Sequence, residues 1–361
     1  MNYFNHFLFR ILTAIIISSF VSCTPKSNIE TLNGSEIETV SLTQFIEKQM
    51  DSLAVVGMSI AIINDAKVVY HRSFGFANIQ DSVKVDNNTI FEAASLSKPF
   101  FAYYTMKLVE QGLLDLDTPL YKYLPYSDIE DDERYKQITA RMVLCHSTGF
   151  PNWRFYYPEN KLFIQFNPGT DFRYSGEGYV YLGKVIAHLK NIKYNKLDFD
   201  IQNTVCKPLG IKHAYFGKCK YIANNKATGY IDGKTADEMW DRTAFNSAAS
   251  LHTNAQDYAK LLIAIMTEDG LNHENISEFL KEQIKLPDDN PLKTEYGFDS
   301  WALGIGIKKI TDYTYFAHGG ENFNFQSYFI FNPKNNNGYV FFTNCNKGLD
   351  FNNRFEKFML E

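Results

Sequence analysis

Residues 55–75 read VVGMSIAIINDAKVVYHRSFG, and the architecture of the chain can be worked out from them. Two runs rich in Val, Ile and aromatic residues flank Asn64–Asp65, a pattern typical of a β-hairpin. The last third of the chain has the same composition, with turn residues such as PKNNNG between its apolar runs. There the pattern predicts four further strands: WALGIGIKKI (301–310), YTYFAHG (313–319), FQSYFIFNP (325–333) and GYVFFTNC (338–345).

Between these β-rich ends the chain changes to helical periodicity. Apolar residues recur at helical spacing in four segments: 95–114, 139–147, 176–190 and 254–270, the last with Asn254 as its cap. Residues 41–53 and 352–360 predict two further helices. Strands at both ends with helices between them predict an α/β fold of the α+β type. We expect one antiparallel sheet built from the N- and C-terminal segments and flanked by helices, with a helical lobe of roughly residues 95–285 inserted.

Composition describes an ordinary globular body. The chain has 361 residues, 45% of them hydrophobic and 21% charged, which excludes wholesale disorder or a fibrous repeat. Thirty-six Lys and Arg against 41 Asp and Glu give a formal net charge of −5. This mild acidity, without a dense basic run, argues against nucleic acid as a partner.

The first residues are expected to be an export signal. One Arg and no acid precede the short apolar run ILTAIIISSFVS, which is too short to span a bilayer comfortably. A small residue before Cys23 resembles the lipobox of bacterial lipoproteins, although Phe20 stands where Leu is usual. The resemblance implies a signal peptide at 1–22, lipidation of Cys23 as the mature N-terminus, and a membrane-anchored lipoprotein of the cell envelope, periplasmic or cell-surface. A plain cleaved signal and an uncleaved anchor are the alternatives; the polar residues 23–40 are expected to be a tether.

The remaining cysteines predict no metal site. Cys145, Cys206, Cys219 and Cys345 form no CxxC pair and match no zinc spacing, and no cofactor motif is present. In an exported protein, Cys206 and Cys219 could pair because they are close in sequence; buried free thiols are the alternative.

The segment FEAASLSKPF carries the first candidate for chemistry. The G-x-S-x-G elbow, Walker, Rossmann and HExxH patterns are absent, whereas Ser95 and Lys98 lie three residues apart at the start of a predicted helix. Residues at this spacing share a helix face, so the amine can approach the hydroxyl. A serine needs a base to become a nucleophile, and a lysine whose pKa is depressed by burial can be that base. The tetrapeptide alone is expected about once by chance in such a chain.

Two further segments add groups that fit this chemistry. Tyr174 lies in NPGTDFRYSGEGYVYLG, at a junction between a loop and a helix, and its phenol could relay a proton. In isolation, such a tyrosine more often packs in a core. His318-Gly319-Gly320 lies on a predicted strand, where two glycines let a substrate approach and backbone N–H groups can form part of an oxyanion hole. Gly-Gly alone more often marks a bulge or bend.

Together, the ordered motifs S-x-x-K, Y-S-x and H-x-G resemble the penicillin-recognising serine hydrolases, in the branch related to class C β-lactamases. ITARMVLCHSTGFP, PGTDFRYSGEGYVYLG and HTNAQDYAKLL are similar to the family's flanking segments, and the resemblance covers residues 41–361. It implies a β-lactamase/transpeptidase-like fold, with Ser95 as nucleophile, Lys98 as its general base and Tyr174 as proton relay. It also implies an oxyanion hole formed by the N–H groups of Ser95 and Glu321. His318 stands where β-lactamases of this class carry a lysine beside the substrate.

Two departures from the family pattern bear on the substrate. Gly176 replaces the asparagine of Y-x-N, and His318 lacks the permanent charge of the family's lysine. A third departure, Ala249–Ser250 in place of Gly-Gly, has no assigned effect. His146 falls in a segment whose role in the family looks structural. We therefore expect a serine hydrolase that forms an acyl-enzyme from an ester or a D-amino-acid amide or peptide. A true class C-type β-lactamase and a non-catalytic, penicillin-binding-like sensor of cell-wall peptide are the alternatives.

Overall fold

The computed structural model describes residues 28–236 and 243–361. The expected signal peptide at 1–22 and Cys23 lie outside the described residues. No helix in the described part of the chain combines the length and the apolar character needed to cross a membrane.

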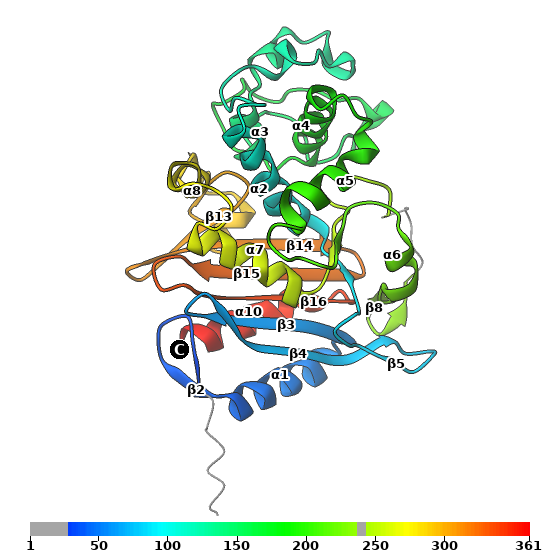
Figure 1. Ribbon diagram of the computed structural model, residues 1–361, viewed down its shortest axis with the longest axis vertical. Coiled ribbons are helices and arrows are strands. Elements are labelled where there is room, and N and C mark those ends of the chain that lie inside the picture. Colours follow the sequence, from blue (N-terminus) through cyan, green and yellow to red (C-terminus); the bar gives the residue numbers. More distant parts are fainter. Residues whose placement is uncertain (1–27, 237–242) are drawn as a thin grey trace, which may run out of the picture.

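One large antiparallel sheet combines the two ends of the chain. Its nine strands follow the order β11-β12-β13-β14-β15-β16-β3-β4-β5, so the first long N-terminal strand pairs with the last C-terminal strand. Figure 1 shows the blue β3 and β4 beside the orange-to-red β14, β15 and β16. This confirms the expected sheet. The strands are β3 (Gly57–Asn64), β4 (Lys67–Asn78), β5 (Val83–Lys84), β11 (Ile284–Lys285), β12 (Ser300–Trp301), β13 (Gly306–Ile310), β14 (Tyr313–Asn322), β15 (Phe325–Asn332) and β16 (Asn337–Thr343).

The hairpin at 55–75 forms as its sequence predicts. β3 and β4 pair in antiparallel register, with Asn64 opposite Lys67. The turn residues Asp65 and Ala66 both have positive φ, at 49° and 55°. Two central residues with positive φ match the right-handed twist of the strands they join.

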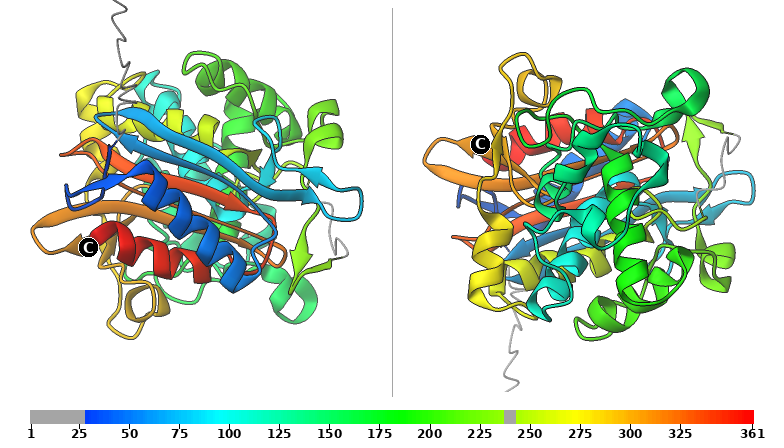
Figure 2. Two further views of the ribbon diagram at one scale, coloured as in Figure 1. Left: turned by 90° about the horizontal axis from the view of Figure 1, so that it is seen from below. Right: turned by 90° about the horizontal axis from the view of Figure 1, so that it is seen from above.

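Helices cover both faces of the sheet. On one face, α1 (Thr39–Leu53) and α10 (Gly348–Leu360) lie side by side, as the view from below in Figure 2 shows. Apolar side chains at helical spacing, such as Leu42 and Ile46 on α1, join sheet residues such as Ile60 in a core on that face. On the other face, α7 (Ala255–Thr267) packs against β3, β4 and β16.

The predicted inserted lobe is present but smaller than expected. At the top of Figure 1 lie α3 (Ala140–Leu144) and α4 (Gly176–Leu189), with α2 (Ser97–Glu110) between them and the sheet. α7 falls inside the interval 95–285 but is a layer of the sheet lobe, because its apolar face is buried against the strands. Apart from a hairpin before α1 and several short 3-10 and π turns, the other elements are α5 (Leu197–Ile201), α6 (Lys220–Asn225), α8 (His273–Leu280), α9 (Pro291–Thr294), the pair β8 (Tyr230–Ile231) and β9 (Lys234–Thr235), and a small sheet of β6 (Phe91–Glu92), β10 (His252–Thr253) and β7 (Ala214–Tyr215).

Two expectations differ from the structure, and the structure decides a question about the cysteines that the sequence left open. Residues 28–38, expected within the polar tether, form the hairpin β1 (Asn28–Glu30) and β2 (Glu36–Glu38), because Ile29 and Leu32 are buried against the sheet lobe. The single strand expected at 301–310 is two short strands, since Gly304 turns the chain with a φ of 85°. Cys206 and Cys219 do not pair; both are free, as are the other described cysteines, Cys145 and Cys345.

Candidate active site

Ser95 lies in a tight turn between the small sheet and α2. The turn is a 3-10 helix, Ala94–Leu96, and Ala94 adopts a φ of 48°. The Ser97 hydroxyl holds the turn by donating to the Ala94 carbonyl at 2.6 Å and accepting from the Leu251 N–H at 2.9 Å. These bonds fix the backbone so that the half-buried Ser95 faces the adjoining cavity.

Lys98 lies behind Ser95 with its side chain fully buried. Its Nζ is 3.1 Å from Ser95 Oγ and donates to the Ala248 carbonyl at 3.1 Å. In the described part of the chain no carboxylate forms an ion pair with it, and burial lowers the pKa of its ammonium to about 7. Because the Ala248 carbonyl takes one N–H, the lone pair of the neutral amine can face the serine hydroxyl. Lys98 therefore meets the geometric and electrostatic requirements of a base for Ser95.

Tyr174 approaches the same two residues from the helical lobe. It precedes α4 by two positions, and Ser175 caps that helix by accepting from the Gly178 N–H at 3.1 Å. The Tyr174 ring lies 4.6 Å from Lys98 Nζ. Burial raises the pKa of its phenol, and a hydrogen bond with Ser95 partly offsets this. A protonated phenol in contact with both residues is suited to carry a proton between them.

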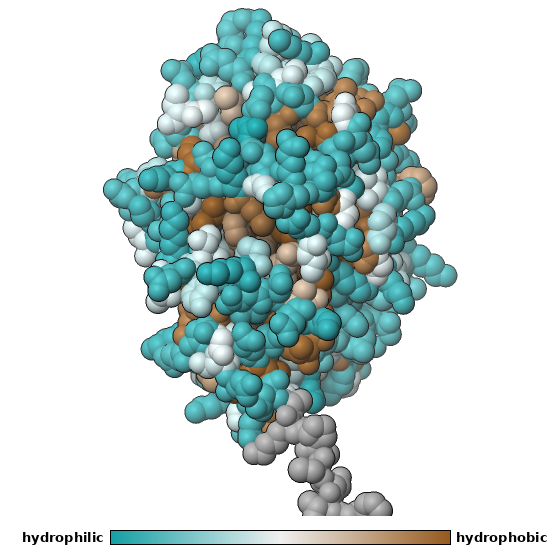
Figure 3. All heavy atoms as spheres, turned by 60° about the vertical axis from the view of Figure 1, so that its left-hand side comes forward, coloured by the Kyte–Doolittle hydropathy of each residue, from teal (hydrophilic) through white to brown (hydrophobic). Residues whose placement is uncertain are grey.

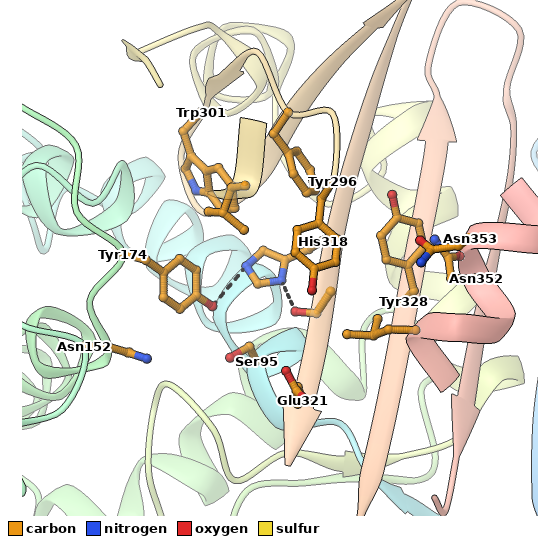
Figure 4. A pocket seen from close by; sticks show the side chains of 14 residues that line it. Ser95, Asn152, Tyr174, Tyr296, Trp301, His318, Glu321, Tyr328, Asn352 and Asn353 are labelled. Carbon is orange, nitrogen blue, oxygen red and sulfur yellow. Dashed lines mark hydrogen bonds between the residues drawn. The ribbon is translucent and has the colours of Figure 1, made fainter. Parts of the chain in front are cut away.

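His318 completes the group from β14 as a neutral imidazole. Its Nδ1 donates to the Gly319 carbonyl at 2.8 Å, which leaves Nε2 to accept from the Tyr174 hydroxyl at 3.5 Å. Figure 4 shows both contacts. Burial, together with the nearby Lys98, lowers the pKa of His318 to about 3. Where the family's lysine would be charged, this site holds an uncharged ring that orients Tyr174.

The glycines of β14 allow the strand to pass close to the Ser95 turn. β13 pairs with β14 only as far as Ala317, so the later residues of β14 border the turn instead. A Cβ atom on Gly320 would lie 2.4 Å from the Ala93 carbonyl oxygen, so the approach requires glycine there. Gly319 has more room, with its nearest neighbours at 3.8 Å. Glu321 follows, its side chain exposed at the cavity.

A cavity of about 330 Å³ opens in front of Ser95. On the face drawn in Figure 3, apolar side chains gather in a hollow at mid-height within a hydrophilic frame. Figure 4 shows Ser95, Tyr174, His318 and Glu321 around one cavity. The structure thus brings the sequence-predicted residues Ser95, Lys98, Tyr174, His318, Gly319, Gly320 and Glu321 to one place. The other residues that line it are Asn152, Leu292, Tyr296, Phe298, Trp301, Tyr328, Leu349, Asn352 and Asn353.

Sequence reasoning missed what replaces the absent asparagine at Gly176. A Cβ on Gly176 would lie 2.5 Å from the Trp153 indole, so this ring occupies the space of the missing side chain. Asn152 accepts from the Gly176 N–H through Oδ1 at 3.0 Å, and Figure 4 shows its amide nitrogen directed toward the Ser95 side of the cavity. No local pattern marks either residue, because both act through a loop that is distant in sequence from Gly176.

Two buried groups near the site were also missed or set aside. His146 accepts a hydrogen bond from the Ser175 N–H at 3.1 Å, and the centre of its ring lies 4.3 Å from that of Tyr174. Through these contacts His146 helps to hold Tyr174 in place. Glu92 on β6 accepts a 2.6 Å hydrogen bond from Asn322 on β14 and pairs with Lys226 at 2.8 Å. The Glu92–Asn322 bond ties the strand leading to Ser95 to the strand carrying Gly320. Among the described residues, no cluster of three or more His, Cys, Asp or Glu side chains could hold a metal ion.

Comparisons with known proteins agree with this architecture. The chain is 25% identical over 326 residues to Protein flp of Staphylococcus aureus (strain NCTC 8325 / PS 47), covering 83% of this chain but only 62% of the relative. Its fold matches the octameric penicillin-binding protein homologue from Pyrococcus abyssi with a TM-score of 0.73 and 25% identity, over 86% of this chain and 74% of that one. It also matches the D-amino acid amidase from Ochrobactrum anthropi SV3, with a TM-score of 0.68 and 21% identity over 84% and 91%. The family model named Beta-lactamase matches residues 42–358, most of the chain, and the protein therefore belongs to the Beta-lactamase family.

Proposed function

We propose that this protein is a serine hydrolase that works through an acyl-enzyme. The observation that carries the proposal is the 3.1 Å contact between Ser95 Oγ and the buried Nζ of Lys98, whose pKa burial lowers to about 7. A lysine with that pKa is about half neutral at pH 7, so a base is present without an acidic partner.

Each step of the reaction has a group to perform it. Ser95 Oγ attacks the carbonyl carbon, its proton passes to Lys98, and the N–H groups of Ser95 and Glu321 stabilise the oxyanion. As the bond to the leaving group breaks, that group takes a proton through Tyr174. Water then attacks the acyl-enzyme ester, and its proton returns to Ser95 as the acid product leaves.

The substrate we propose is an ester or a D-amino-acid amide or peptide. His318 is neutral beside the reacting serine, so it offers no permanent charge to the carboxylate that penicillins and cephalosporins carry. The Trp153 ring fills the position from which an asparagine would bind a substrate amide. Both features support acyl substrates other than β-lactams.

The experiment is hydrolysis of a short-chain p-nitrophenyl ester by protein lacking residues 1–23, beside Ser95→Ala prepared identically. We expect activity that disappears in Ser95→Ala and falls at least about 100-fold in Lys98→Ala. Equal activity in wild type and Ser95→Ala would refute the nucleophile. Rapid turnover of a chromogenic cephalosporin would favour a β-lactamase, and a persistent covalent adduct in intact-mass spectra would favour a sensor.

We also propose that the protein is an exported lipoprotein anchored to a membrane through Cys23. Support comes from the short apolar run that ends in a small residue before this cysteine. Radiolabelled palmitate should enter the wild-type protein and not Cys23→Ala. Equal labelling of the two proteins, or none in either, would contradict the anchor.

A further inference from the structure

The cavity in front of Ser95 combines aromatic walls with one negative charge. Among its fourteen lining residues, all in the described part of the chain, Glu321 is the only Asp, Glu, Lys or Arg. Five others are aromatic: Tyr174, Tyr296, Phe298, Trp301 and Tyr328. Aromatic faces and a carboxylate attract cations, and neither attracts a carboxylate.

Glu321 is available to a ligand. Its side chain is exposed and accepts a 3.0 Å hydrogen bond from Gln326, and within the described ranges no Lys, Arg or His forms an ion pair with it. Its charge contributes to raising the pKa of Tyr296 on the cavity wall, after burial as the larger cause. In Figure 4, Glu321 lies beside Ser95 at the same end of the cavity.

The nearby cations are already engaged or lie in neighbouring cavities. Lys98 lies behind Ser95 and contacts the serine and the Ala248 carbonyl. Lys308 lines the cavity next to α10 and pairs with Glu356, and Arg173 lines the cavity on the opposite side and donates to Tyr157. Among the described residues, Glu321 is the only Asp, Glu, Lys or Arg that lines this cavity, so its carboxylate would repel a carboxylate bound next to Ser95.

We propose that the site selects acyl groups with a free ammonium on the carbon next to the scissile carbonyl, and that Glu321 binds this ammonium. The inference rests on the proposed function, in which the N–H of Glu321 holds the carbonyl oxygen. Because the side chain of Glu321 carries a carboxylate, a substituent on the carbon next to the bound carbonyl comes within reach of that carboxylate. An N-acetylated analogue lacks the positive charge, and an N-succinylated analogue carries a negative charge in its place.

The test compares three p-nitroanilides at about pH 7: D-phenylalanine p-nitroanilide and its N-acetyl and N-succinyl derivatives, with the L-series in parallel. We expect kcat/KM to be at least about tenfold higher for the free amine than for the acetyl form, and lowest for the succinyl form. Glu321→Gln should reduce the ratio of free to acetylated substrate about tenfold. Asp131→Asn removes an exposed charge that pairs with Lys161 outside the cavity and should leave the ratio unchanged.

The outcomes separate this inference from the proposed function. Suppose that Ser95-dependent ester hydrolysis occurs. If the N-acetyl substrate is then cleaved with the same kcat/KM as the free amine, or if Glu321→Gln leaves the ratio of the two unchanged, the inference is wrong while the proposed hydrolase function stands. If no Ser95-dependent hydrolysis of ester or anilide occurs, the proposed function fails. Binding to Ser95→Ala protein by calorimetry then decides the inference. Phenylalanine amide should bind about tenfold tighter than its N-acetyl derivative, and equal affinities would overturn the inference.

Discussion

Lys98 makes activity depend on pH in a direction that the structure determines. Burial lowers its pKa to about 7, and only the neutral amine can accept the Ser95 proton. We therefore predict that kcat/KM for a p-nitrophenyl ester rises with pH, reaches half its maximum near pH 7 and levels off above about pH 8. The pH profile of wild type against Lys98→Ala measures this.

His318 should not add a second limb to that profile. Its pKa is lowered to about 3, so it stays neutral throughout the range in which the enzyme is assayed. A profile that is flat or falls between pH 5 and pH 8 would contradict Lys98 as the base. Residual activity of Lys98→Ala with the same ascending limb would contradict it equally.

The stability cost of replacing Gly176 should depend on the neighbouring Trp153 ring. We predict that Gly176→Asn, which restores the family's residue, lowers the free energy of unfolding by about 1–3 kcal/mol, because its Cβ would lie 2.5 Å from the Trp153 ring. In a Trp153→Ala background the same substitution should cost much less. Urea unfolding of the four proteins measures this coupling, and equal costs in both backgrounds would refute the steric account.

The motif residues could be predicted from the sequence, whereas their surroundings could not. Ser95 and Lys98 are three residues apart, so their approach follows from local geometry. Tyr174 and His318 could be added only because their motifs follow in a familiar order. Asn152, Trp153 and the tautomer of His318 depend on contacts between distant segments, which no local pattern records.

β14 and the Ser95 turn form one functional unit because they touch through Gly320. We predict that Gly320→Ala lowers kcat for ester hydrolysis by about 100-fold, since its Cβ would lie 2.4 Å from the Ala93 carbonyl and from Ser327 Oγ. Moving β14 away would separate the N–H of Glu321 from that of Ser95. Steady-state kinetics and thermal unfolding measure the two effects.

Gly319→Ala is the matched comparison on the same strand. Its Cβ would meet its nearest neighbours, Leu349 and Tyr328, at 3.8 Å, an ordinary contact distance. It should therefore lower kcat far less than Gly320→Ala. Similar losses in the two variants would show that the close approach at Gly320 is not what holds the oxyanion donors together.

Periodicity predicts which segments form helices and strands more reliably than where those elements pack in the fold. The helix capped by Asn254 is present as α7, with the cap accepting from the Asp257 N–H at 3.0 Å. Its pattern gave no sign that it covers the sheet, since either lobe can bury an apolar stripe. Residues 301–310 have the composition of one strand, and only Gly304 hinted at the turn that divides it.

For the whole molecule, the main feature that the sequence obscured is where the folded body begins. Residues 28–38 are mostly polar, so composition favoured a tether, yet the hairpin β1–β2 is joined to the sheet lobe. Leu32 donates to the Met359 carbonyl at 2.8 Å, and Glu30 and Asn64 exchange hydrogen bonds at 2.9 and 2.8 Å. Three apolar residues, Ile29, Leu32 and Ile37, among polar ones carry too little periodicity for a pattern to reveal burial.

We predict that this hairpin contributes to the stability of the entire domain. Ile29 and Leu32 are each 1% exposed, and burying two such side chains stabilises by about 3 kcal/mol or more. Protein beginning at Asn28 should unfold in urea like protein beginning at Thr24, whereas protein beginning at Thr39, with α1 intact, should lose about that free energy. The double variant Ile29→Ala/Leu32→Ala should reproduce most of the loss without shortening the chain. Equal stability of the proteins beginning at Asn28 and Thr39 would mean that the hairpin merely rests on the domain and that the tether extends to α1.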